Sequence, residues 1–281
     1  MDLRARDATG EDYDRFVEFF AMLAAGHTPP PRALWASHLC RSSFFLETPG
    51  GETVAYAMCS PYGEHGDVRQ VAVAAEWRKR GIGRQLMLAV AERLAAAGCT
   101  RWALEVREDN TAAIGLYHSV GLSPVRRQVV LRAGERTLRA IARQRSATAV
   151  VSPAPEVDDA HAERVLGLPP GLMARMRSLR PGVLILSLDE PSGPAPGPHG
   201  LARWLPDIAE AYGILHPFIA RNVAEAGALI HSLLASDAGA ANAEVEVTVE
   251  EPGVARALEA AGAVVSERLR IMTGPLPAAT T

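Results

Sequence analysis

A stretch from Trp77 to Leu86, WRKRGIGRQL, has the residue types that bind a phosphorylated ligand. Apolar residues recur with the period of a helix from Ile82 onward, so the two glycines lie where a helix is expected to begin. The free N–H groups and the dipole of a helix N-terminus favour a pyrophosphate, and a glycine lets it approach closely because it lacks a Cβ. The residues predicted to form this cradle are Arg78, Lys79, Arg80, Gly81, Ile82, Gly83 and Arg84.

Other phosphate-binding patterns fit this stretch less well. A P-loop needs Gly-x4-Gly-Lys-Ser/Thr, which the sequence lacks, and a dinucleotide fingerprint needs a third glycine where Leu86 stands. A nucleic-acid patch interleaves aromatic residues with cations, and Trp77 is the only aromatic residue nearby. The formal charge of −3 and the pI of about 6.3 also argue against a nucleic-acid partner.

The elements that must position the cradle follow from hydrophobic periodicity and turn residues. They are predicted in the order β-α-α-β-β-β-α-β-α-β, with Asn110 as the cap of the last helix. The ranges are a strand over 2–8, helices over 10–25 and 29–40, a hairpin over 42–62, a strand over 67–75, a helix over 82–98, a strand over 100–108, a helix over 110–121 and a strand over 123–134.

The second half of the chain repeats the pattern of the first. RNVAEAGAL begins 143 residues after RKRGIGRQL, and a strand and a helix ending in glycine follow each of them. Matched elements in the same order indicate a duplicated domain. The predicted fold class is α/β (α+β), with domains over 1–145 and 146–281, a linker at about 146–163 and a long loop over 191–200.

Two motifs resemble the GNAT superfamily of N-acetyltransferases. VAVAAEWRKRGIGRQLM resembles its acetyl-CoA loop, and LEVREDNTAAIGLYHSVGL resembles the second half of the same signature. Together they cover about residues 68–125, which identifies the chain as a tandem GNAT protein whose C-terminal copy is degenerate. The resemblance implies acetyl-CoA as the donor, with its pantetheine arm along the backbone of Val71, Ala72 and Val73. It also implies a gap between this strand and the next that holds the acyl group.

The resemblance also suggests which residues carry the chemistry. Acylation of an amine needs a base for the amine and an acid for the leaving thiolate. Tyr117 lies where the family places its acid, and Glu105 where a related branch places a base. We expect Glu105 to be partly buried if helices cover both faces of the sheet, which would favour a basic carboxylate. The alternative bases are Glu64, His65 and Asp67, and Asn110 is expected to contact coenzyme A as well as to cap its helix.

The second copy departs from the pattern at the positions that carry chemistry. Ala224 and Ala226 replace the loop glycines, and Leu258 stands where Tyr117 is expected. Glu246 aligns with Glu105, and Glu251 with Asn110. The N-terminal copy is therefore predicted to transfer acetyl from acetyl-CoA directly to a primary amine, and the second copy to have lost catalysis. The alternative is an acyl-CoA sensor without turnover.

Composition limits the cofactors, partners and compartment. Cys40, Cys59 and Cys99 have no CxxC spacing, so neither a disulfide framework nor a metal is expected. The sequence has no long apolar run and no signal-like N-terminus, which predicts a cytoplasmic protein without a membrane partner. The acceptor is a small-molecule or peptide amine that the sequence does not identify, and the oligomeric state is left open between a monomer and a homodimer.

Overall fold

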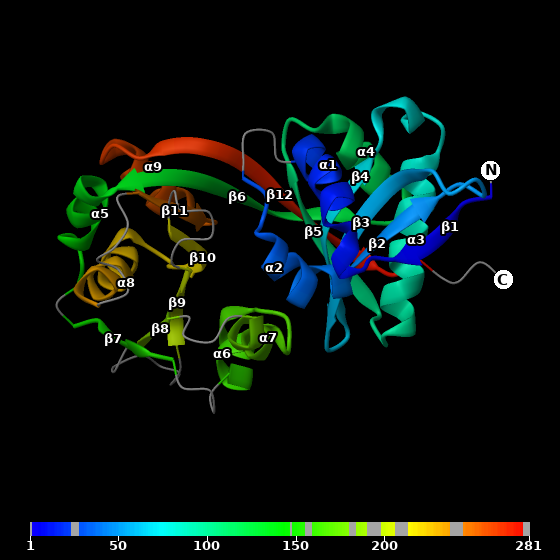
Figure 1. Ribbon diagram of the computed structural model, residues 1–281. Coiled ribbons are helices and arrows are strands. Elements are labelled where there is room, and N and C mark those ends of the chain that lie inside the picture. Colours follow the sequence, from blue (N-terminus) through cyan, green and yellow to red (C-terminus); the bar gives the residue numbers. More distant parts are fainter. Residues whose placement is uncertain are drawn as a thin grey trace. The chain divides into compact units, whose positions relative to one another are not determined.

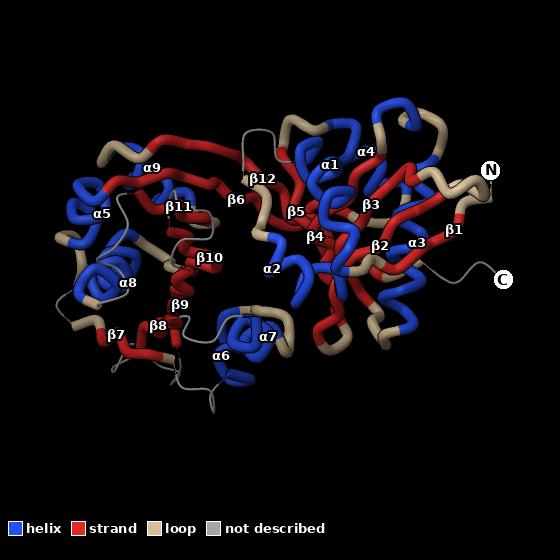
Figure 2. Tube along the Cα trace, viewed as in Figure 1, coloured by secondary structure: helices blue, strands red, loops and turns tan. Residues whose placement is uncertain are grey.

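The protein is described by a computed structural model of residues 2–23, 28–146, 148–154, 159–179, 184–189, 198–205, 213–236 and 244–277. Two compact units divide the chain. Unit 1 comprises residues 1–125 and 270–281, and unit 2 comprises residues 126–269. Each of them contains both helices and strands (Figure 2).

Unit 1 begins with strand β1 and two short helical regions before its central strands (Figure 1). The helical elements are η1 (Gly10–Asp12), α1 (Tyr13–Leu23), α2 (Arg32–Leu34), η2 (Trp35–Leu39), η3 (Cys40–Ser42), η4 (Ala75–Trp77), α3 (Ile82–Ala96) and α4 (Thr111–Ser119). The strands are β1 (Arg4–Asp7), β2 (Ser43–Glu47), β3 (Thr53–Tyr62), β4 (His65–Val73) and β5 (Arg101–Arg107). These elements follow the predicted order.

The sheet of unit 1 has the order β1-β2-β3-β4-β5-β12, in which the last position is taken by the C-terminal part of β12 (Val264–Pro275). Strands β1 to β4 pair antiparallel, whereas β4 and β5 pair parallel. The register of β3 against β4 moves from Met58 opposite Gln70 to Cys59 opposite Val68. Strand β4 therefore has one extra residue, Arg69, and a bulge of this kind bends the strand and increases its twist.

Helices cover the two faces of this sheet with separate apolar clusters. Helices α3 and α4 pack on one face, where Trp102, Leu104 and Tyr117 are buried together. Helix α1 packs on the other face, where Phe16 stacks on Trp35 with ring centroids 4.4 Å apart. Helix α3 lies so close to β4 that a Cβ on Gly66 would be 2.4 Å from a methyl group of Leu94. This contact requires a glycine and fixes α3 against the sheet.

Unit 2 has the same succession of elements. Its strands are β6 (Ser123–Gly134, from Arg126 onward), β7 (Val150–Pro153), β8 (Leu184–Asp189), β9 (Pro198–Leu205), β10 (Gly213–Ile219), β11 (Glu244–Val249) and the first part of β12. Its helices are α5 (Glu135–Ala142), α6 (Asp159–Leu166), α7 (Leu172–Leu179), α8 (Val223–Ala235) and α9 (Pro252–Ala260).

The sheet of unit 2 repeats the architecture of unit 1. Its order is β7-β8-β9-β10-β11-β6, and β10 pairs parallel with β11 whereas the pairs β7/β8, β8/β9, β9/β10 and β11/β6 are antiparallel. The register of β10 against β9 moves from Leu215 opposite Trp204 to Phe218 opposite Ala202, which places one extra residue in β10. Each unit thus contains a parallel pair, β4/β5 or β10/β11, and its fourth strand has a bulge.

Strands β6 and β12 belong to both units along their length, and they are neighbours in the sheet order. The sequence places 123–134 at the end of the first domain, but residues 129–134 of β6 pair with β11 in unit 2. Residues 270–275 of β12, which follow the second copy in sequence, instead complete the sheet of unit 1. The expected boundary between residues 145 and 146 therefore falls inside unit 2.

Two segments expected to lack regular structure contain secondary structure. The expected linker at 146–163 includes strand β7, which pairs antiparallel with β8, and the start of α6. The expected loop over 191–200 ends in the first residues of β9, and its residues 191–197 lie outside the described residues. In both cases the pairing partner is distant in sequence, so local composition does not reveal the strand.

Candidate active site

The parallel strands β4 and β5 separate at the bulge. Their pairing runs from His65 opposite Arg101 to Val68 opposite Leu104, although β4 continues to Val73 and β5 to Arg107. In the described part of this sheet, no ladder pairing joins the two strands beyond Val68. Strand β4 therefore has backbone groups facing β5 that a ligand can bind, along the stretch that includes Val71, Ala72 and Val73. Such groups need a partner when water is excluded.

The start of α3 follows this open strand after one turn of 3-10 helix. Gly81 caps α3, and its carbonyl accepts from the N–H groups of Arg84 and Gln85 at 3.1 and 3.2 Å. The N–H groups of Ile82 and Gly83 precede the first intrahelical donors, so they have no helical acceptor. With the dipole of a 15-residue helix behind them, these groups form an anion-binding position.

The two glycines at the start of α3 differ in backbone conformation and in surroundings. Gly81 has φ +80, in the left-handed region, and a Cβ there would contact nothing within 4 Å. Gly83 has an ordinary helical position, but a Cβ there would lie 3.1 Å from Cδ2 of Leu116 in α4. Arg84 Nη1 also donates to the carbonyl of Ser119 at 3.3 Å. The start of α3 is therefore joined to the helix that carries Tyr117.

The loop side chains are held mainly by neighbours in unit 1. Arg78 Nε donates to the carbonyl of Val73 at 3.0 Å, and the Arg80 guanidinium lies 5.1 Å from the ring centroid of Trp77. The Trp77 indole donates to Glu52 Oε1, in the turn between β2 and β3, at 2.9 Å. Sequence reasoning missed this contact because a hydrogen bond across 25 residues leaves no local pattern.

Tyr117 lies in α4 and is 7% exposed. Burial raises the pKa of its phenol to about 12, because the apolar surroundings disfavour the phenolate. The phenol consequently keeps its proton at neutral pH and can act as a proton donor. His118, its neighbour, is exposed, as its outward helical position predicts.

Glu105 is exposed in the structure, so the expectation that it is partly buried is wrong. The buried residues of β5 are Trp102, Leu104 and Val106, which face α3 and α4, and alternation along the strand places Glu105 on the opposite face. Arg107, on the same face as Glu105, forms an ion pair with Asp109 at 2.9 Å. A role for Glu105 as base therefore rests on its position beside the strand opening.

The alternative bases lie at the other end of the same strands. His65 and Asp67 are half-buried residues of β4, and Glu64 is exposed in the turn before it. Asp67 faces Arg69 at 3.9 Å, and its register partner in β5 is Ala103. His65 stacks on Tyr62 at 6.0 Å, and its Nδ1 is buried without a hydrogen-bond partner in the described residues.

Asn110 caps α4 as predicted. Its Oδ1 accepts from the N–H of Ala113 at 3.1 Å. In unit 2, Glu251 caps α9 in the same way and accepts from the N–H of Gly253 at 3.1 Å. The exposed Asn110 side chain leaves its amide group accessible to a ligand.

The corresponding helix start in unit 2 is occupied by the chain itself. Glu225 is 8% exposed, and its carboxylate accepts from the backbone N–H of Arg221 at 2.8 Å and from the guanidinium of Arg221 at 2.8 Å. Asn222 caps α8 through the N–H of Glu225 at 3.0 Å. Ala226, in place of Gly83, is fully buried. The Glu225 carboxylate therefore occupies the N-terminal end of α8, where a bound phosphate would need space and positive charge.

Comparisons with known proteins show the family to which the chain belongs. The sequence model of the acetyltransferase (GNAT) family matches residues 12–122, which lie in unit 1. The N-alpha-acetyltransferase RimI of Mycobacterium tuberculosis is 34% identical over 123 residues, which are 42% of this chain and 76% of that protein. The chain belongs to the GNAT acetyltransferase family. GNAT proteins in general use acetyl-CoA and act on amine acceptors, including proteins and small molecules.

Solved GNAT structures resemble the chain along almost its whole length. A GCN5-related N-acetyltransferase from Sphaerobacter thermophilus has a TM-score of 0.63 at 18% identity, covering 98% of this chain and 96% of that one. A tandem GNAT protein from the clavulanic acid biosynthesis pathway has a TM-score of 0.61 at 15% identity, covering 99% and 100%. These likenesses show the fold, a mixed sheet flanked by helices, at a size that fits two tandem GNAT domains.

Three properties complete the description of this GNAT protein. Within the described residues, no three His, Cys, Asp or Glu side chains are grouped so that they could hold a metal ion. No helix among those residues combines the length and the apolar character that crossing a membrane requires. The three cysteines are buried and free, and burial raises the pKa of the Cys59 thiol to about 11.

Proposed function

We propose that unit 1 transfers an acetyl group from acetyl-CoA directly to a primary amine. The observation that carries the proposal is the separation of β4 and β5 after Val68, directly before a helix start with free N–H groups. An open strand edge can bind the amides of the extended pantetheine arm of coenzyme A. The helix start can bind the pyrophosphate of the same molecule. The residues that fit the donor are Val71, Ala72, Val73, Arg78, Lys79, Arg80, Gly81, Ile82, Gly83, Arg84 and Asn110.

The proposed reaction needs no covalent enzyme intermediate. The thioester supplies an activated acetyl carbon, to which the amine nitrogen forms a bond as the C–S bond breaks. Tyr117 donates its proton to the departing sulfur, and its raised pKa keeps the phenol protonated at neutral pH until then. Glu105, or one of Glu64, His65 and Asp67 through water, takes the proton that the amine loses. A backbone N–H of the open β4 edge polarises the thioester carbonyl.

Unit 2 is proposed to be a degenerate GNAT copy that does not bind the donor. The repeated strand order, parallel pair and bulge support a common origin of the two units. The Glu225 carboxylate beside α8 would repel a pyrophosphate, and Leu258 offers no proton where Tyr117 does. Catalysis is therefore assigned to the N-terminal copy, over the proposed domain 1–145.

The acceptor class is proposed as a peptide or small-molecule amine. The relative from Mycobacterium tuberculosis is named for α-amine acetylation, so a peptide with a free α-amine is the first acceptor to test. The exposed carboxylate of Glu105, on β5 directly after its last pairing with β4, would attract a cationic amine.

The proposal is tested by measuring thiol release from acetyl-CoA with a panel of peptide and small-molecule amines. Tyr117→Phe keeps the packing and removes the proton, so we expect turnover to fall by about 10²-fold while acetyl-CoA affinity is retained. A Tyr117→Phe variant with full turnover would remove Tyr117 from the mechanism. Donor binding without turnover by any amine would favour the sensor function instead.

The assignment of the donor to unit 1 has its own matched pair of variants. Gly83→Val in the loop of unit 1 should abolish acetyl-CoA binding, since its side chain would push against Leu116 and project from the anion-binding turn. Ala224→Val, at the half-buried position in the first turn of α8 that aligns with Gly81, should leave acetyl-CoA affinity unchanged. Loss of binding only in the second variant would reverse the assignment.

A further inference from the structure

Positive charge is concentrated in one short segment of an otherwise acidic protein. Seven arginines and one glutamate lie between Arg126 and Arg145, whereas the whole chain has a formal charge of −3. Helix α5 lies within this segment and buries Leu138, Ile141 and Ala142 while its arginines are exposed. A general abundance of arginine does not account for this local excess over acidic residues.

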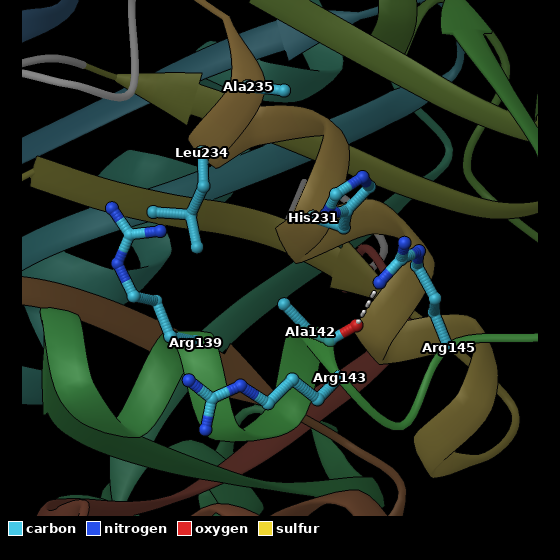
Figure 3. Close-up of a pocket in the computed structure, with 7 residues that line it drawn as sticks. All are labelled: Arg139, Ala142, Arg143, Arg145, His231, Leu234 and Ala235. Atoms are coloured by element: carbon cyan, nitrogen blue, oxygen red, sulfur yellow. Dashed lines mark hydrogen bonds between the residues drawn. The ribbon is translucent and has the colours of Figure 1, made fainter.

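Three of these arginines line a cavity of about 230 Å³ in unit 2. Arg139 lies in the last turn of α5, and Arg143 and Arg145 follow that helix. His231 comes from α8 (Figure 3). The remaining lining residues are Ala142, Leu234 and Ala235, so no acidic side chain lines the cavity among the described residues. The cavity thus has a small apolar floor and a strongly cationic rim.

A close helix contact fixes these groups relative to one another. A Cβ on Gly227 in α8 would lie 2.6 Å from the carbonyl oxygen of Ile141 and 2.9 Å from the backbone nitrogen of Arg145. His231 is one helical turn beyond Gly227, on the same side of α8. The approach of the two backbones at Gly227 therefore places His231 and Arg145 at one cavity.

The guanidinium groups retain donors for a ligand. Arg145 Nη1 donates to the carbonyl of Ala142 at 3.3 Å, which orients the group and leaves its other N–H groups available (Figure 3). Arg139 is paired with Glu135 through Nη2 at 2.6 Å. In the part of the chain that the structure describes, the side chains of Arg143 and His231 form no hydrogen bond or ion pair.

We propose that this cavity binds a small molecule through a phosphoryl group. The N–H groups of one guanidinium can donate to two oxygens of a phosphate dianion at once. Several cations at one place also favour a doubly charged ligand over a single carboxylate. The volume admits a small phosphate ester. No aromatic platform lines the cavity among the described residues, and the acidic chain as a whole is unsuited to nucleic acid.

The test is titration of the full-length protein with glycerol 3-phosphate and, separately, with inorganic phosphate. Binding is measured by calorimetry and by broadening of the ³¹P resonance of the ligand. We expect saturable binding that sodium chloride at equal ionic strength does not reproduce. Arg143→Ala and Arg145→Ala should each weaken binding by about tenfold or more, because each removes charge-assisted hydrogen bonds. Arg136→Ala is the matched control, since this exposed arginine of α5 does not line the cavity.

Further measurements distinguish phosphate binding at this cavity from phosphate binding elsewhere on the protein. Saturating coenzyme A should leave the affinity for glycerol 3-phosphate unchanged, and competition between them would place the phosphate at the start of α3 and overturn the proposal. Equal affinities of the wild type, Arg143→Ala and Arg145→Ala, or binding of an oligonucleotide without binding of either phosphate, would also overturn it. Equal affinity for both probes would identify the phosphoryl group as the recognised part. These binding measurements do not depend on acetyl transfer. They therefore test the phosphate site even if no acetyltransferase activity is found.

Discussion

Gly81 and Gly83, at the start of α3, give a prediction that separates two physical effects of adding a Cβ, backbone strain and steric contact. Gly81→Ala places a side chain at φ +80 with free space around it. The left-handed conformation costs about 1–2 kcal/mol for a residue with a Cβ. We therefore expect Gly81→Ala to lower the free energy of unfolding by about 1 kcal/mol, after the smaller unfolded-state entropy of alanine is included.

Gly83→Ala is affected by a neighbouring side chain instead. Its new Cβ would lie 3.1 Å from Cδ2 of Leu116, which is closer than the ordinary 3.5–4.0 Å between carbon atoms. Overpacking of this kind costs about 1 kcal/mol or more, whereas alanine is favoured over glycine within a helix by about 1 kcal/mol. The two effects nearly cancel, so the single variant should be close to neutral.

The two causes become distinguishable when Leu116 is shortened. In a Leu116→Ala background the contact is absent, so Gly83→Ala should stabilise the protein by about 1 kcal/mol through helix propensity alone. The double-mutant cycle should then give a coupling energy of about 1 kcal/mol between positions 83 and 116. Gly81→Ala is the control, since it should give no coupling with Leu116→Ala.

Denaturant unfolding, followed by the circular dichroism of the helices, measures all of these variants. A coupling energy of less than about 0.3 kcal/mol between positions 83 and 116 would contradict the reasoning, because independent sites add to within that amount. Coupling of Gly81→Ala with Leu116→Ala would contradict it as well, since no atom lies within 4 Å of that added methyl group.

Three other predictions concern buried or capping groups. Tyr117 has its pKa raised to about 12 from 10.0, so the folded state holds this proton more tightly, and the protein should lose stability as pH rises from about 10 to 12. In Tyr117→Phe this loss should be smaller but not absent, because burial also raises the pKa of Tyr56; an identical pH profile would refute the assignment. Asn110→Ala and Glu251→Ala each remove a helix cap, so each should cost about 1 kcal/mol in denaturant unfolding, and a change under about 0.3 kcal/mol would argue against a stabilising cap. Glu225→Gln retains the shape but removes the charge that faces the Arg221 guanidinium, so thermal unfolding should report a loss of about 1–3 kcal/mol, without any change in acetyl-CoA affinity.

Features with a local cause were predictable from the sequence. The cap at Asn110 depends on residues within one turn, and the start of α3 depends on Gly81 and the apolar period that follows it. The hairpin between β2 and β3 follows from Gly51 and its neighbours, where the N–H of Gly51 donates to the carbonyl of Thr48 at 2.9 Å. In each case a few adjacent residues contain all of the interacting groups.

Features of the site that depend on distant partners were not predictable in the same way. The exposure of Glu105 depends on which elements cover its face of β5, and alternation along the strand does not reveal them. The contact between Gly83 and Leu116, like the hydrogen bond from Trp77 to Glu52, joins residues more than 20 positions apart. The roles of Tyr117 and Glu105 in catalysis remain predictions to be tested by the experiments above.

The sequence by itself determined the family resemblance, the order of helices and strands, and the loss of the loop glycines at Ala224 and Ala226. Only the tertiary structure decided that β6 completes the sheet of unit 2 and that residues 270–275 complete the sheet of unit 1. It also decided that Glu225 occupies the helix start in unit 2. The physical reason is that residue type sets which conformation a segment adopts and which of its faces is apolar. The backbone hydrogen bonds of a strand, however, accept any strand with a compatible register, so its partner is chosen by the packing of the whole chain.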